Sequence, residues 1–476
     1  MNSTDLAFTP ALEQARLIRH REISPLELTE LYLNRIEQLD PQLGCYFTVL
    51  ADAAIADAKA KTEQLTQTED PNLLPAFFGV PISVKDLNPM QGVPFTMGNA
   101  ALKESIIEFD DATVGHIRKA GYVILGKTAT PELGTVPYTE PPGFPPTRNP
   151  WNLDYTPGGS SGGAAAALAA GLCAIAQGSD GGGSIRGPAF CCGLWGIKPS
   201  RGRISYAPIG DTPGGLGTNG PLARTVADAA AFLDIASGYV LGDPYWLPEP
   251  EQPFLASAQQ GAREGVGRSL KVGYVTSIAP IGPVHDDCQQ AVLEMAKRLD
   301  AIGHDVEETQ LDCTPLIDPF TLVFRACLGG TGIPVEAMSP LNQWLVSHND
   351  SSADYFAAVW QMQIIARQIV AHFHPYDVVI MPTFAHPQIR VGEWADLSPE
   401  ETFEKVTHWV MPSPPINATG QPAMAAPTGF AENGLPLGVQ LVGRPGDEAT
   451  LIALSAHLET LYPWAHQRPP MSQTKD

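Results

Sequence analysis

The sequence predicts an α/β fold, and three observations lead to that prediction. Short apolar runs of the kind found in buried strands recur along the chain, and stretches with apolar residues at helical spacing separate them. Glycine and proline number 45 each, which indicates many turns and shaped loops. Hydrophobic residues make up 44% of the 476 residues, so the chain can bury a sizeable core. Strands that alternate with helices are typical of α/β folds with a parallel or mixed sheet.

The N-terminal part is expected to be helical. Ser24 is a capping residue, Pro25 takes the first helical position and Glu27 the third. Apolar residues follow at roughly helical spacing, namely Leu28, Leu31, Tyr32, Ile36 and Leu39. The predicted helix ends before Pro41, because proline interrupts a helix.

The rest of the chain alternates between predicted strands and predicted helices. The expected strands are Gly79–Val84, Tyr122–Leu125, Leu172–Ala176, Leu270–Val275, Asp377–Met381 and Leu437–Val442. The expected helices are Asp111–Ala120, an alanine-rich segment after Gly163, Asp286–Ile302 and Glu448–Leu461. One plausible linker, Gly242–Glu264, is rich in proline, glutamate and glycine, and it is either a domain boundary or a long surface excursion.

Charge and cysteine usage exclude several classes of protein. The formal net charge is −22, which counts against nucleic acid or an anionic membrane surface as a partner, because both need basic patches. The 7 cysteines are an odd number without a CxxC pair, so free thiols in a cytoplasmic protein are expected. The N-terminus lacks the features of a signal peptide. The longest apolar run, Ala164–Ala176, falls short of the roughly 20 residues that span a bilayer.

The most informative stretch is Thr156–Arg203, which holds two glycine-flanked serine sites. The first is Gly158–Gly163, with the sequence GGSSGG, and the second is Gly181–Ser184, with the sequence GGGS. Glycine lets the backbone adopt positive φ and approach a ligand closely. Consecutive N–H groups in such a turn can converge on an anion, which is the geometry of an oxyanion hole. The two sites lie at opposite ends of one helix–strand unit, and this argues against a merely flexible loop.

Other interpretations of glycine-rich loops fit poorly. No lysine follows either cluster as in a phosphate-binding loop, and no GxGxxG motif follows a strand. The pattern GxSxG occurs at Gly158–Gly162 and suggests the nucleophile elbow of an α/β-hydrolase. That elbow must follow a buried strand, and the preceding Trp151–Pro157 has no strand pattern.

A reactive serine needs a base, and Lys85 is the candidate. None of the 11 histidines lies near the serine clusters in the sequence, although spatial proximity cannot be inferred from spacing. Lys85 follows the apolar run Val80–Val84 and therefore sits at a strand end, where α/β sheets place functional groups. A lysine whose pKa is lowered by burial can accept a proton at neutral pH.

Several phrases of the sequence together resemble the amidase signature family. They are GVPISVKD (79–86), VILGKTATPEL, TRNPWN, GGSSGG, GSDGGGSIRGPA (178–189), GIKPSRGRIS, GPLART, NATGQPA and GLPLGVQLVGRPGDE. The resemblance covers nearly the whole chain, from the N-terminal helices to Leu461. It implies a large mixed β-sheet core flanked by α-helices, as in the amidase signature fold.

The resemblance also implies a catalytic triad of Lys85, Ser160 and Ser184. Ser184 is then the nucleophile that attacks an amide carbonyl, and Ser160 is a bridging serine held by a cis peptide. Lys85 acts through Ser160 as the base and returns a proton to the leaving amine. The backbone amides of Gly181, Gly182, Gly183 and Ser184 form the oxyanion hole. No cofactor is implied.

The same resemblance sets the expected organisation of the chain. We expect residues 1–476 to form a single amidase signature domain. Within it, residues 1–65 are an N-terminal helical region and residues 66–240 are the catalytic core with the triad. Residues 265–476 are a second half that completes the sheet and the substrate pocket.

The expected substrate class comes from the second half of the chain. The second half more loosely resembles bacterial amidases that act on small linear or cyclic amides, including nylon-oligomer hydrolases. A small aliphatic, aryl or ω-amino amide is therefore expected, with Gly159, Tyr138 and Cys327 as substrate contacts. Gly181 stands where the family usually has threonine or another side chain, and we hypothesise that it loosens the hole or widens the acyl pocket.

Alternatives from other classes stay open. One is the glutaminase-type A subunit of a tRNA-dependent amidotransferase, against which the acidic charge weighs. Others are a Ser-His-Asp α/β-hydrolase and a non-catalytic relative. His372 and His374 lack a third ligand nearby, so no metal is expected. The expected partner is a small-molecule amide, without nucleic acid or membrane, and a homodimer is possible.

Overall fold

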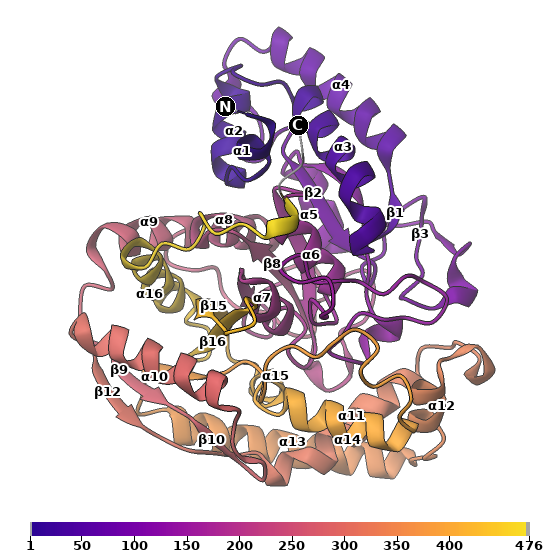
Figure 1. Ribbon diagram of the computed structural model, residues 1–476, viewed down its shortest axis with the longest axis vertical. Helices are drawn as coiled ribbons and strands as arrows, with labels where there is room; N and C mark the ends of the chain where they lie inside the picture. Colours follow the sequence, from indigo (N-terminus) through magenta and orange to yellow (C-terminus); the bar gives the residue numbers. More distant parts are fainter. Residues whose placement is uncertain (1, 473–476) are drawn as a thin grey trace.

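An 11-stranded mixed β-sheet runs through the molecule, and helices cover it (Figure 1). The computed structural model describes residues 2–472 of the protein. The strand order is β1-β5-β2-β6-β8-β7-β15-β16-β14-β9-β12. The bounds are Tyr46–Val49 (β1), Pro81–Lys85 (β2), Val123–Thr128 (β5), Ile175–Asp180 (β6), Trp195–Lys198 (β7), Thr218–Ala223 (β8), Lys271–Tyr274 (β9), Asp305–Glu308 (β12), Val378–Pro382 (β14), Ala423–Phe430 (β15) and Pro436–Gly443 (β16). The predicted α/β fold with a large mixed sheet is confirmed.

Parallel pairing brings the ends of two strands to one edge of the sheet. β2 pairs in parallel with β5 on one side and with β6 on the other, and Ile82 lies opposite Ile175. β6 then pairs antiparallel with β8, where Asp180 lies opposite Thr218. Because parallel strands end at the same edge, Lys85 at the end of β2 lies beside the last residues of β6. The glycine-rich loop that follows β6 starts at this edge.

Helices pack on the sheet and gather at its two ends. In Figure 1, α1–α4 lie together at one end of the molecule, and α11–α14 lie together at the other. The helix bounds are Ser3–Ala7 (α1), Ala11–Arg19 (α2), Pro25–Leu43 (α3), Ala51–Gln67 (α4), Ala112–Lys119 (α5), Gly162–Ala169 (α6), Arg186–Cys192 (α7), Val226–Ala236 (α8), Phe254–Glu264 (α9), Asp286–Ala301 (α10), Ile317–Gly329 (α11), Pro340–Val346 (α12), Ser352–Phe373 (α13), Pro399–Val410 (α14), Pro414–Thr419 (α15) and Glu448–Leu461 (α16).

Short strands form two further small sheets. Ser277–Ala279 (β10), Gly282–Pro283 (β11) and Leu311–Asp312 (β13) make a three-stranded sheet, and Val93–Pro94 (β3) pairs with Ile106–Ile107 (β4). Among the helices within residues 2–472, none is both long and apolar enough to cross a membrane.

Local signals located most elements correctly, with two corrections. The capping box at Ser24 is present: its side chain accepts from the Glu27 N–H, and the Glu27 carboxylate accepts from the Ser24 N–H. The helix, however, runs past Pro41 to Leu43, so Pro41 lies in its last turn. Gly44, in a left-handed conformation, ends the helix. The supposed linker is also partly helical, since α9 occupies its second half and packs on α16 and α8.

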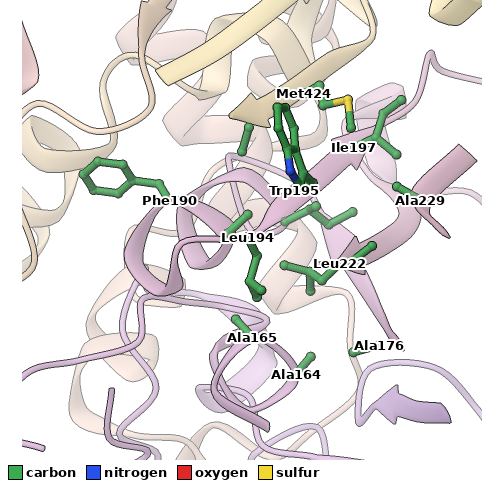
Figure 2. Close-up of a cluster of buried hydrophobic side chains, with 14 of the residues drawn as sticks. Ala164, Ala165, Ala176, Phe190, Leu194, Trp195, Ile197, Leu222, Ala229 and Met424 are labelled. Carbon is green, nitrogen blue, oxygen red and sulfur yellow. The ribbon is translucent and has the colours of Figure 1, made fainter. Parts of the chain in front are cut away.

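The alanine-rich segment forms a helix buried on every side. All residues of α6 are buried. A Cβ built on Gly163 would lie 2.5 Å from the Ala129 backbone nitrogen, so α6 can lie against the sheet only with a glycine there. Figure 2 shows Ala164 and Ala165 in a cluster that also contains Ala176, Leu194, Trp195, Ile197, Leu222 and Met424. This packing fixes the segment between the two serine sites.

Candidate active site

A largely apolar cavity of about 320 Å³ lies where the glycine-rich loops meet α11, α14 and α15. Ser160 and Ser184 both line it. Its apolar wall comes mainly from the second half of the chain and includes Leu316, Ile317, Phe320, Phe324, Leu328, Phe384, Phe403, Val406, Val410 and Met411. The structure therefore brings the two predicted serines together at one wall of a single cavity.

Lys85 is fully buried at the end of β2, directly behind Ser160. Its Nζ donates to Ser160 Oγ at 2.7 Å and to the Ser179 carbonyl oxygen at 3.3 Å. Its backbone N–H donates to Gln177 Oε1, which ties β2 to β6. Burial lowers the pKa of Lys85 to about 7, although the nearby Asp180 carboxylate acts in the opposite direction. The amine can therefore be neutral close to physiological pH.

Ser160 is held by its glycine neighbour. The Gly159–Ser160 peptide bond is cis, and Ser160 is buried. A Cβ built on Gly159 would lie 2.7 Å from the Tyr138 backbone nitrogen, so the chain could not pass at this distance with a side chain. Ser161 continues the loop: its N–H donates to the Ser184 carbonyl oxygen at 3.2 Å. That bond fastens the first serine site to the second.

Ser184 is half-buried between the glycine loop and α7. The preceding Gly183 has φ +120°, and a Cβ there would lie 2.7 Å from the Ser413 Cβ. Glycine is therefore required for the turn that presents Ser184 to the cavity. The Gly183 carbonyl oxygen accepts from the Gly187 N–H, which joins the loop to the first turn of α7.

Sequence reasoning missed a buried ion pair that holds this loop. Asp180 and Arg186 are fully buried, and Arg186 Nη2 lies 2.9 Å from Asp180 Oδ1. Burial by itself would raise the pKa of Asp180, but Arg186, Asn417 and Lys198 hold it well below its usual range. The carboxylate also accepts from the Gly183 and Ile185 N–H groups. The signal was present in the motif SDGGGSIRG, where two charged residues flank the glycines.

Residues far along the chain complete this network. Arg186 donates to the Ser413 carbonyl oxygen, to Gln440 Oε1 and to Asn417 Oδ1. Asn417 Nδ2 donates in turn to Asp180 Oδ1 at 2.9 Å. All these side chains are buried, and they connect the loop to α15 and β16. Hydrogen-bonded buried charges of this kind keep a loop in one geometry.

The network determines which backbone N–H groups of the loop are already hydrogen-bonded within the protein. Gly183, which the resemblance places in the oxyanion hole, donates its N–H to Asp180 Oδ1 at 2.7 Å. Within residues 2–472, no hydrogen-bond acceptor takes the N–H groups of Gly181, Gly182 or Ser184. These three amides, rather than that of Gly183, are thus available to a ligand in the cavity.

A second buried network supports Lys85 from behind. Lys127 Nζ donates to Asp86 Oδ1 at 2.7 Å and to the Asn88 carbonyl oxygen at 2.8 Å. Gln177 Nε2 donates to Asn88 Oδ1, and Gln177 Oε1 accepts from the Lys85 N–H. Lys127, on the neighbouring strand β5, is thus already paired with Asp86, which leaves Lys85 as the amine that faces the serines.

Two of the three expected substrate contacts lie at the cavity. Gly159 and Cys327 line the cavity. Tyr138 packs edge-on against Trp394, with ring centroids 5.6 Å apart, and its role as a substrate contact stays a prediction. Burial raises the pKa of Cys327 to about 11, so its thiol stays protonated at neutral pH.

The positions of the histidines bear on two alternatives, a Ser-His-Asp triad and a metal site. No histidine is among the residues of 2–472 that line the cavity. No group of three or more metal-ligating side chains is found within those residues. His372 Nε2 lies 2.7 Å from the Gln310 carbonyl oxygen, at the end of α13.

Comparisons with known proteins agree on one family. The family model described as Amidase matches residues 27–331 and 321–452. A putative amidase from Synechocystis sp. is 47% identical over 456 residues, which cover 96% of this chain and 89% of that protein. The 6-aminohexanoate-cyclic-dimer hydrolase of Pseudomonas sp. is 33% identical and covers 99% and 98% of the two chains. A solved structure of 6-aminohexanoate cyclic dimer hydrolase with substrate superposes with a TM-score of 0.88 at 30% identity, over 98% of this chain and 100% of that one. This chain therefore belongs to the amidase signature family of amide hydrolases.

Proposed function

We propose that this enzyme hydrolyses a small, largely apolar carboxylic amide through an acyl-enzyme on Ser184. The observation that carries the proposal is the 2.7 Å contact between Lys85 Nζ and Ser160 Oγ, at the wall of the cavity that Ser184 also lines. A neutral lysine can accept a proton, and a hydroxyl can relay one. Together with Ser184, these groups supply a nucleophile, a relay and a base.

The reaction begins with attack by Ser184 Oγ on the amide carbonyl. Its proton passes to Ser160 Oγ, while the Ser160 proton passes to Lys85 Nζ. The tetrahedral oxyanion is stabilised by the backbone amides of Gly181, Gly182 and Ser184. Removing one such donor typically costs about 2.7–4 kcal/mol of transition-state stabilisation. Lys85 returns the proton through Ser160 to the nitrogen as the amine leaves, and water then attacks the ester of Ser184 to release the acid.

The cavity supports an apolar and uncharged substrate. Its lining residues within 2–472 include no lysine or arginine, and the one acidic residue, Asp180, is already paired with Arg186. A charged group in this cavity would lose its hydration without a counter-charge, which is costly. Aliphatic and aryl amides therefore fit better than amino acids or ω-amino acids with free charges.

The glutaminase alternative is less well supported for the same reason. Glutamine carries a carboxylate and an ammonium group, and no basic side chain of the described cavity wall would bind the carboxylate. The net charge of −22 also opposes direct contact with tRNA. The Ser-His-Asp alternative lacks a histidine among the described residues that line the cavity.

A cytoplasmic location is part of the proposal. All seven cysteines, which lie within residues 2–472, are free, as expected in a reducing compartment. Homodimer formation stays a prediction that sedimentation of the purified chain can check.

The test is a substrate panel with the purified chain. Aliphatic, aryl and ω-amino amides and glutamine are compared by release of ammonia or amine, and the acyl-enzyme is sought by mass spectrometry of the Ser184 peptide. We expect hydrolysis of the uncharged amides and an acyl mass on that peptide. The proposal would be contradicted if the Ser184→Ala variant kept full amide hydrolysis. It would also be contradicted if glutamine were the only compound of the panel that the enzyme hydrolysed.

A further inference from the structure

Tyr206 is a polar residue in the apolar cavity that the proposed mechanism does not use. It follows β7 in the loop that leads to β8, and its side chain lines the cavity together with Ser160 and Ser184. In the part of the chain that the structure describes, its hydroxyl has no hydrogen-bond partner. The Tyr32 hydroxyl, by contrast, has a partner, because it donates to the Ala7 carbonyl oxygen at 2.9 Å.

The Tyr206 hydroxyl lies close to the glycine loop of the active site. A Cβ built on Gly217 would lie 2.9 Å from Tyr206 Oη, so glycine at this position allows the hydroxyl to approach the backbone. Gly217 directly precedes Thr218, which lies opposite Asp180 in the pairing of β6 with β8. The hydroxyl is therefore near the end of β6, where the loop that carries Ser184 begins.

Hydrogen bonds on both sides of Tyr206 hold its backbone in place. The Ser205 hydroxyl donates to Asp243 Oδ1 at 2.7 Å and accepts from the Ala207 N–H at 3.0 Å. The Ala207 carbonyl oxygen accepts from the Ala112 N–H at 2.7 Å. A polar group positioned in this way in an apolar wall is typical of binding sites, where a few polar groups fix the orientation of the ligand.

The phenol stays neutral at working pH. Burial, aided by Asp211, raises the pKa of Tyr206. A neutral phenol donates one hydrogen bond and also accepts, so it can pair with a carbonyl oxygen or with an N–H group. A ligand that covers this hydroxyl without pairing with it leaves it unsatisfied, which is unfavourable, whereas a ligand that pairs with it avoids this cost.

We propose that Tyr206 determines specificity by hydrogen bonding to a second, uncharged polar group of the substrate. This inference rests on the proposed function, since it concerns the same cavity. The substrate class is then an amide that carries a second neutral hydrogen-bonding group, such as another amide, beyond an apolar segment. A site built to bond such a group discriminates against an analogue that lacks it.

Two amides of matched shape test the proposal. Hexanediamide carries a second amide, and 6-methylheptanamide replaces it by an isopropyl group of similar size. We expect the Tyr206→Phe variant to lower kcat/KM for hexanediamide by about 3- to 10-fold, because one net hydrogen bond is lost. The same variant should leave kcat/KM for 6-methylheptanamide unchanged. An equal loss for both amides, or no loss for either, would overturn the proposal.

Tyr122→Phe is the matched control. The Tyr122 hydroxyl is buried and has no partner within the described residues. The Tyr122 ring stacks on Phe77, with ring centroids 4.6 Å apart, and Tyr122 is not among the residues that line the cavity. This variant should leave both kinetic constants as in the wild type. If Tyr122→Phe also lowered kcat/KM for hexanediamide but not for 6-methylheptanamide, loss of a phenol hydroxyl away from the cavity would suffice for the effect. That result would overturn the proposal.

Binding measurements separate this inference from the proposed function. In the Ser184→Ala background, calorimetry compares the affinity for the two amides with and without Tyr206→Phe. We expect the second substitution to weaken only the binding of hexanediamide, by about 3- to 10-fold. If the wild type hydrolyses neither amide but this difference is found, the catalytic proposal fails and the role of Tyr206 stands. If hydrolysis is found and affinity does not discriminate, the role of Tyr206 fails alone.

Discussion

Lys85 Nζ lies 2.7 Å from Ser160 Oγ, so the two atoms are in direct hydrogen-bond contact, and both side chains are buried. When the lysine is charged, it donates this hydrogen bond. When it is neutral, the same short contact allows the Ser160 proton to move to nitrogen. In the proposed mechanism, the protonation state of this buried amine therefore controls whether the contact is structural or catalytic.

The pH dependence of activity should report this amine. Its pKa is lowered to about 7 by burial, and in the proposed mechanism the neutral form is the base. The value of kcat/KM should therefore rise with pH through about 7 and level off above it, because deprotonation produces the active form. Initial rates between pH 5 and 9 measure this rising limb of the pH profile. A profile that is flat across this range, or that falls as pH rises through 7, would argue against Lys85 as the base.

Replacing the two serines should give losses of different size. Ser184→Ala removes the nucleophile and should lower kcat by about 10⁴-fold or more. Ser160→Ala removes the relay, and loss of a general acid–base group costs about 10²–10⁴-fold. Single-turnover kinetics with an uncharged amide distinguish the two, since an acyl-enzyme can still form in Ser160→Ala. The assignment of roles is wrong if only Ser160→Ala prevents acylation.

Alanine substitutions at two glycines of the site should differ in their effect on stability. At Gly159 a Cβ would lie 2.7 Å from Tyr138 N and 2.8 Å from the Pro137 carbonyl carbon, and backbone cannot easily give way. Gly159→Ala should therefore lower the free energy of unfolding by about 1–3 kcal/mol. At Gly181 nothing lies within 4 Å of the added Cβ, so stability should change by less than about 0.5 kcal/mol.

Urea unfolding measures both glycine variants, and kinetics add a second readout. Because Gly181 lines the cavity, its alanine variant should lower kcat/KM for bulky amides more than for acetamide. Identical activity on all substrates would show that the open space at Gly181 does not widen the acyl pocket.

Local patterns predicted well the elements that local interactions determine. The capping box of α3 and the bounds of α16 depend on neighbouring residues, and the sequence sufficed for both. The passage of α3 through Pro41 and the helix at 254–264 were not predictable, because tertiary packing overrides local breakers.

The site likewise contains residues that the sequence could identify and contacts that it could not. Lys85, Ser160 and Ser184 stand in motifs that can be recognised in the chain, and the structure brings them to one place. The partners of Arg186 could not be inferred, because Asn417 in α15 and Gln440 in β16 are more than 200 positions away and reach it only through the tertiary fold. The engagement of the Gly183 amide by Asp180 is likewise a matter of three-dimensional geometry.

The pairing of Asp180 with Arg186 leads to a prediction that separates structure from electrostatics. Asp180→Asn leaves the Arg186 charge buried without its partner, which should cost about 3–5 kcal/mol of the free energy of unfolding. It also removes the negative charge that raises the pKa of Lys85, so the rising limb of the pH profile should move below its wild-type position. Glu448→Gln breaks another buried pair, with Arg203, away from the cavity wall, and should destabilise the protein while the limb stays in place. If the limb moves equally in both variants, loosening of the fold explains the shift, and the field of Asp180 at Lys85 does not.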